Sequence, residues 1–198
     1  MATLKPKDFI KPVLIDELGS MIETHPYISF IMMGIGIEFL GKCMDSTLND
    51  WNANGRSQRD FENAIKLIPS LQRYESSLTT YDLYGSFRCG LAHAAAPKIK
   101  ITLSSKDQMG HLVEAGGRLN LKAEDFYNDF KLACEYVVNK IYPTTDKMNS
   151  DYLEVPGNSF NPGTSILTGT SINTGSTIVN NTTSSAASGT STNITFRP

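Results

Sequence analysis

The sequence predicts a mainly α-helical protein, a bundle of four or five helices with a small antiparallel β insertion and a low-complexity C-terminal tail. Apolar residues recur at helical spacing in five stretches before residue 145. The period changes to two in the segment KIKITL that starts at Lys98. From Gly157 nearly every residue is Ser, Thr, Gly, Asn or Ala. We therefore expect a helical domain over 1–145, a linker over 146–156 and a tail over 157–198.

Prolines indicate where the first two helices start. One helix is expected from about Pro12 to Thr24, because proline is accepted in the first turn. The second follows Pro26 and carries the run YISFIMMGIGIEFLGKCM, which is apolar on nearly all sides and predicts the central helix. Its most apolar part, Tyr27–Leu40, contains Glu38 and is shorter than the roughly 20 apolar residues that cross a bilayer. A core helix without membrane contact is the interpretation.

Two later helices begin with the pattern Ser/Thr-x-x-Asp, which is typical of a helix N-terminus. The helix from Ser57 is expected to end at Pro69. The helix from Thr79 is expected to reach His93 and to be stopped by Pro97. Helical spacing returns over Phe126–Ile141, which predicts the last helix.

The β insertion is expected at about 98–121. In KIKITL the alternation places Ile99, Ile101 and Leu103 on one face of a half-buried strand. The segments HLVE and RLNL are further strand candidates joined by AGG. Together they predict an antiparallel meander of two or three strands.

Charge and cysteine content narrow the class of protein. Lys and Arg total 18, Asp and Glu 20, and the net charge is −2, which argues against tight generic binding of nucleic acid by one subunit. Three widely spaced cysteines predict buried reduced thiols in a cytoplasmic protein, with no disulfide framework, zinc site or cofactor. The N-terminus lacks the apolar core of a signal peptide.

The tail contains a six-residue repeat. Gly157, Gly163, Gly169 and Gly175 recur at that interval, and an apolar residue follows each glycine by three positions. A disordered tail, a β-solenoid and self-association by cross-β stacking all remain open interpretations. The last of these would make the chain a self-assembling adaptor.

The hexapeptide RCGLAH places Arg88 and His93 close together in sequence near the end of a predicted helix. On an ideal helix five residues correspond to about 140° of rotation, so the two side chains would not share a face. They would meet only if the helix loosens near Gly90 or if a second subunit completes the site. Asp82 and His93 lie about 16 Å apart along an ideal helix, which excludes a Ser–His–Asp triad with Ser86.

Metal-independent RNA cleavage is the chemistry that suits this pair. A histidine titrates near neutral pH and can take the proton of a ribose 2′-hydroxyl or give one to the leaving 5′-oxygen. An arginine stays charged and can bind the phosphate while negative charge develops. We therefore treat Arg88 and His93 as the candidate catalytic residues.

An Arg-x4-His motif late in a small helical bundle resembles the HEPN superfamily of helical domains. Glu38 and Lys42, in IEFLGK, look like the Glu and Lys often found on a HEPN core helix. The resemblance covers roughly 10–141. It implies a homodimer that cuts RNA at its interface, often as part of a toxin–antitoxin or antiviral defence system, with an antitoxin as a further partner. It implies that Arg88 binds the phosphate and that His93 is the catalytic histidine.

Other roles for these residues are open as well. Glu38, Lys42, Tyr84 and Cys89 are expected to support the site from outside it. The position after the arginine is often polar in active HEPN members and is Cys89 here, so a non-catalytic binding or scaffolding module is the alternative. Arg88 stacked on Tyr81 or Tyr84, His93 at a helix C-terminus, and an internal Glu38–Lys42 salt bridge are the purely structural readings. His25 and His111 stand alone in the sequence and receive no role.

Overall fold

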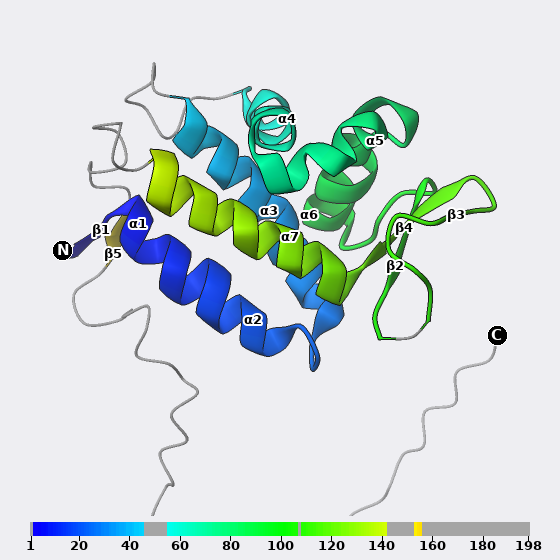
Figure 1. Cartoon of the computed structure of the whole chain (residues 1–198), viewed down its shortest axis with the longest axis horizontal. Helices are drawn as coiled ribbons and strands as arrows, with labels where there is room; N and C mark the ends of the chain where they lie inside the picture. The colour runs from blue at the N-terminus through cyan, green and yellow to red at the C-terminus, as the bar shows by residue number, and fades with distance from the viewer. Residues whose placement is uncertain (1, 46–54, 107, 142–152, 156–198) are drawn as a thin grey trace, which may run out of the picture. The chain divides into compact units, whose positions relative to one another are not determined.

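The computed structural model describes residues 2–45, 55–106, 108–141 and 153–155. These residues form a mainly helical domain with a small three-stranded sheet (Figure 1). The expected fold class, mainly α with a small β insertion, is confirmed at this level. Trp51 and the repeat tail over 157–198 lie outside the described residues.

The N-terminal helical stretch begins earlier than predicted. It runs through α1 (Pro6–Phe9), the π-helix η1 (Ile10–Glu17) and α2 (Leu18–Met21), so Pro6 rather than Pro12 occupies the first turn. Pro12 falls inside η1. Because it has no N–H, it cannot make the usual α-helical hydrogen bond there, and this part of the helix has π-helical rather than α-helical turns.

The central helix α3 (Pro26–Met44) is confirmed where the sequence predicted it. The last helix, α7 (Ala123–Tyr136), continues into the π-helix η4 (Val137–Ile141) and lies along α3 in Figure 1. Together they supply half of the largest fully buried side chains. The fully buried ones on these two helices include Phe30, Met33, Ile37, Leu40, Phe126 and Phe130.

The middle of the chain contains more helix than the sequence indicated. The predicted helix α4 (Ser57–Leu67) is followed by the 3-10 helix η2 (Pro69–Tyr74) and by α5 (Glu75–Thr80). The helix expected from Thr79 instead begins at Leu83, as η3 (Leu83–Cys89), and continues as α6 (Gly90–Ala94).

The β insertion differs from the predicted antiparallel meander. Its strands β2 (Ile101–Ser104), β3 (Glu114–Ala115) and β4 (Arg118–Lys122) have the order β2-β4-β3. The β2–β4 pair is parallel, and only β3–β4 is antiparallel. Parallel pairing requires a connection longer than a hairpin turn, and residues 105–117 provide it. Ile99 is 76 % exposed, against prediction, because Lys98–Ile101 forms a turn before the strand.

A second, two-stranded sheet was not predicted. Strand β1 (Ala2–Leu4) pairs antiparallel with β5 (Leu153–Val155), which falls in the segment expected to be a linker. The two strands lie beside α1 in Figure 1.

Among the described helices, α3 is the one whose length and hydropathy would allow it to span a membrane. It is surrounded by α4, α6, α7 and η1, and much of its surface is buried by them. Its apolar composition follows from this central position, as the core-helix interpretation expected.

Candidate functional site

The helix that carries the RCGLAH motif is irregular at both ends. Asp82 precedes it in the left-handed conformation with a φ of 49°, and its side chain accepts a hydrogen bond from the Gly85 N–H at 3.2 Å. The π-helical turns of η3 follow and end at Cys89. Ala95, with a φ of 51°, ends α6. The helix is therefore irregular on the N-terminal side of Gly90 and again where it ends.

Gly90 allows the chain to turn back against its own helix. A Cβ atom at this position would lie 2.7 Å from the Ala96 carbonyl oxygen and 3.1 Å from the Lys98 nitrogen. The Lys98 N–H also donates a hydrogen bond to the Ser86 carbonyl oxygen at 2.8 Å. The glycine in the motif is thus required by backbone packing.

Arg88 lies against the central helix. Its guanidinium forms an ion pair with Glu38 of α3, and 14 % of the arginine side chain is exposed. Glu38 also pairs with Lys42, one turn further along α3, at 3.3 Å. The two helices pack closely here, since a Cβ atom at Gly34 would lie within van der Waals distance, 3.7 Å, of the Arg88 Cα. The expected Glu38–Lys42 bridge is present, with Arg88 as an additional partner.

Tyr84 and Cys89 lie next to the guanidinium. The Arg88 Cζ atom is 5.9 Å from the centroid of the Tyr84 ring, which is the stacking that the sequence allowed. The Tyr84 ring in turn contacts Phe61 of α4 at 5.6 Å between centroids. Burial, followed by a hydrogen bond with Cys89, raises the pKa of the Tyr84 hydroxyl to about 12. Tyr84 therefore stays protonated and neutral beside Arg88.

The surroundings of His93 differ from those of Arg88. It is exposed to solvent in the last turn of α6, the position where a cation is favoured by the helix dipole. The described residues show no contact between its side chain and that of Arg88, which is engaged with α3. The nearby end of α6 is attached to α3 by a hydrogen bond from the Tyr27 hydroxyl to the Ala95 carbonyl oxygen at 2.5 Å. One subunit therefore does not bring the two candidate catalytic side chains together.

A line of charged side chains extends from this site along the α3–α4 crossing. Asp60 of α4 is 3 % exposed, and burial raises the pKa of its carboxyl group although Arg56 and Lys42 act in the opposite direction. The two helices touch at Gly41, where a Cβ atom would lie 1.7 Å from the Asp60 carbonyl oxygen. No sequence pattern indicated this cluster, because α3 and the start of α4 contribute to it from separate parts of the chain.

A second polar cluster lies at the junction of η2, α7 and the β insertion. Tyr74 donates a hydrogen bond to Asp129 at 2.5 Å and contacts His111 Nε2 at 2.7 Å. The Lys122 N–H donates to His111 Nδ1 at 3.0 Å. Arg73 pairs with Asp129 at 3.3 Å. A lone histidine between loop residues carried no sequence signal for this arrangement.

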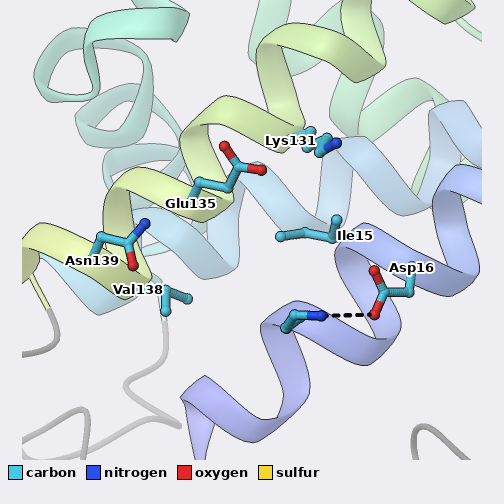
Figure 2. Close-up of a pocket in the computed structure, with 7 residues that line it drawn as sticks. Ile15, Asp16, Lys131, Glu135, Val138 and Asn139 are labelled. Carbon is cyan, nitrogen blue, oxygen red and sulfur yellow. Dashed lines mark hydrogen bonds and ion pairs between the residues drawn. The ribbon is translucent and has the colours of Figure 1, made fainter.

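A groove of about 310 Å³ lies between η1 and the helix formed by α7 and η4 (Figure 2). Arg88 and His93 do not line it. Lys11 and Asp16, both of η1, pair at 3.5 Å on one wall of the groove, and both are well exposed. Figure 2 shows Glu135 and Lys131 of α7 on the opposite wall. Solvent-exposed charges of both signs around Ile15 do not make a reactive set. Elsewhere in the described ranges, no three His, Cys, Asp or Glu side chains are placed to hold a metal ion.

No protein-family model, curated protein or solved structure matches the chain.

Proposed function

We propose that the chain is a HEPN-like, metal-independent endoribonuclease that acts as a homodimer in the cytoplasm, with Arg88 and His93 as its catalytic residues. The proposal rests on the different surroundings of the two side chains of the motif. Arg88 is held in a fixed position by Glu38 and Tyr84, and His93 is exposed on the following turn. A fixed cation and a solvent-accessible imidazole are the two groups that backbone cleavage requires.

In this mechanism His93 takes the proton of the ribose 2′-hydroxyl. The 2′-oxygen attacks the phosphorus, the bond to the 5′-oxygen breaks, and a protonated histidine returns a proton to that leaving group. Arg88 binds a non-bridging phosphate oxygen as charge develops there. Its guanidinium has five N–H donors, and the ion pair with Glu38 engages one terminal nitrogen.

The dimer is part of the proposal because the two side chains do not meet in one subunit. A second copy related by two-fold symmetry brings two copies of the same helix into one cleft. A partly exposed apolar stripe on α3 supports this arrangement, since Ile28 and Ile35, seven residues apart on one face, are 48 % and 42 % exposed. This stripe leads towards Glu38, and α6 packs on the same helix.

The test is RNA cleavage in EDTA by the purified protein and by Arg88→Ala and His93→Ala variants. We expect both variants to lose at least about 100-fold in rate, the lower end of what a general acid–base contributes. His25→Ala and Arg118→Ala are matched controls, because both wild-type residues are exposed and lie outside the motif. Equal rates in all five proteins would exclude the proposed site.

The alternative is a HEPN-like binding or scaffolding module without activity. The engagement of Arg88 by Glu38 favours it, because a neutralised arginine binds phosphate less well. Expression in a host cell distinguishes the two functions. A growth defect that His93→Ala removes, with unchanged protein level, would contradict the non-catalytic alternative.

A further inference from the structure

His111 connects a loop of the β insertion to two helices of the bundle. The loop segment Gln108–Val113 carries it from the insertion, Tyr74 belongs to η2 and Asp129 to α7. The His111 side chain is only 5 % exposed. Its ring also packs against Tyr74 and Phe126, with centroids 5.7 and 6.2 Å away. The imidazole is therefore a buried contact between the insertion and the bundle.

The hydrogen bonds define the protonation state of this ring. Because the Lys122 N–H donates to Nδ1, that nitrogen must carry a lone pair. The single proton of the neutral ring then sits on Nε2 and is donated to the Tyr74 hydroxyl oxygen, whose own proton goes to Asp129. In this series of hydrogen bonds, every donor has an acceptor only while His111 is neutral.

A second proton on the ring would have to go to Nδ1. That nitrogen would then present an N–H to the Lys122 N–H, and both donors would be buried without an acceptor. The rest of the segment is held by Asn120, whose side-chain amide donates to the Gly110 carbonyl oxygen at 2.9 Å and whose backbone N–H donates to Val113. Those bonds end at Asn120, so the described hydrogen bond between this segment and Lys122 is the one that His111 accepts.

We propose that His111 is a proton-operated latch, which fastens the segment 108–113 to Lys122, where β4 meets α7, when neutral and releases it from Lys122 when protonated. This inference is independent of RNA cleavage, because none of its residues belongs to the Arg88–His93 site.

The charges around the ring determine the pH range. Burial is the largest effect and lowers the pKa of His111, and Arg73 of η2 and Lys122 of β4 act in the same direction. Asp129 and Asp125 of α7 oppose them. Since the docked ring takes up a proton less readily than a free one, docking is strongest above the ordinary histidine pKa of about 6.5. It weakens as the pH falls from there towards the lowered pKa.

The amide of Lys122 is the direct reporter of the latch. Its hydrogen-exchange protection factor would be measured by NMR in the full chain between pH 8 and pH 5, with the ring nitrogens of His111 observed in the same samples. We expect a neutral Nε2–H ring at pH 8. We expect Lys122 protection to be lost progressively, relative to α3 amides, as the pH falls and the ring takes up its second proton. Unchanged relative protection down to pH 5, or a proton on Nδ1 at pH 8, would overturn the latch.

Two variants separate the latch from simple loss of structure. In His111→Asn the side-chain oxygen can accept the Lys122 N–H but cannot be protonated, so Lys122 protection should become independent of pH. If that variant leaves Lys122 unprotected throughout, Tyr74→Phe decides. It removes the link to Asp129 and keeps Nδ1, so the pH dependence should persist, and its loss would contradict the proposal. His25→Asn, an exposed histidine exchanged in the same way, should show the wild-type pH dependence of Lys122 protection.

Discussion

The guanidinium of Arg88 is paired with the carboxylate of Glu38, and only 14 % and 7 % of these two side chains are exposed. The pair fixes the π-helical segment η3 to the central helix α3. Arginine in the RCGLAH motif is therefore a structural residue as well as the candidate phosphate ligand, and its two roles can be separated by measurement.

Glu38→Gln should lower the free energy of unfolding by about 3 kcal/mol, because it leaves the Arg88 charge largely buried without its partner. Urea denaturation at pH 7 measures this. The double variant with Arg88→Met should recover much of the loss, since neither charge then remains unpaired. Glu62→Gln breaks the more exposed Glu62–Lys66 pair and should cost less than about 1 kcal/mol. Strictly additive effects of the Glu38 and Arg88 substitutions would contradict this account.

Gly41→Ala should destabilise the protein by about 3 kcal/mol or more, because the new methyl group would lie 1.7 Å from the Asp60 carbonyl oxygen. The backbone of α4 would have to move away from α3. Gly34→Ala is the matched control in the same helix, since its Cβ would meet the edge of the Phe87 ring at 3.3 Å. Thermal unfolding should show a much larger drop in Tm for the first variant, and similar Tm values for both would show that the α3–α4 crossing is not so tight.

Asp60→Asn tests the buried carboxyl group at that crossing. Because burial raises the pKa of Asp60, the folded protein binds its proton more tightly than the unfolded chain does. The contribution of this group to stability is then greatest below its ordinary pKa of 3.8 and is lost as the pH rises through the raised value. The variant should gain stability relative to wild type between pH 4 and pH 7 in urea denaturation. A difference that stays constant over this range would mean that Asp60 does not titrate as described.

Thiol labelling should distinguish Cys89 from the other two cysteines. Cys43 and Cys134 are buried, and burial raises the pKa of the Cys134 thiol well above its ordinary value, whereas Cys89 is partly exposed. A thiol reagent should modify one cysteine per chain quickly in the native protein and all three in denaturant. Cys89→Ser should abolish the fast phase, and a fast phase that survives this substitution would place the reactive thiol elsewhere.

The sequence predicted helices well where apolar spacing was regular. The helices α3, α4 and α7 begin or run where the pattern placed them, because burial against one another determines that spacing. The parallel β2–β4 pair was missed because pairing direction depends on how residues 105–117 cross the sheet, and period-two alternation carries no such information. The π-helical turns of η3 were missed for a related reason, since an apolar period cannot show which backbone hydrogen bonds form.

The candidate site was predictable only in its local parts. The Glu38–Lys42 bridge and the Arg88–Tyr84 contact follow from helical spacing within one element. The Arg88–Glu38 pair and the His111 cluster join elements that are distant in sequence, so no spacing rule reaches them. Whether two copies of the motif meet across a dimer stays a prediction.

The packing of Gly90 also bears on how related sequences should vary. A side chain there would collide with Ala96 and Lys98, so glycine should persist in relatives whether or not they cleave RNA. Arg88 and Glu38 should be kept or lost together, because their ion pair is largely buried. His93 is exposed and meets no comparable packing demand. Among the six residues of RCGLAH, His93 is therefore the one whose conservation in related sequences would indicate catalysis.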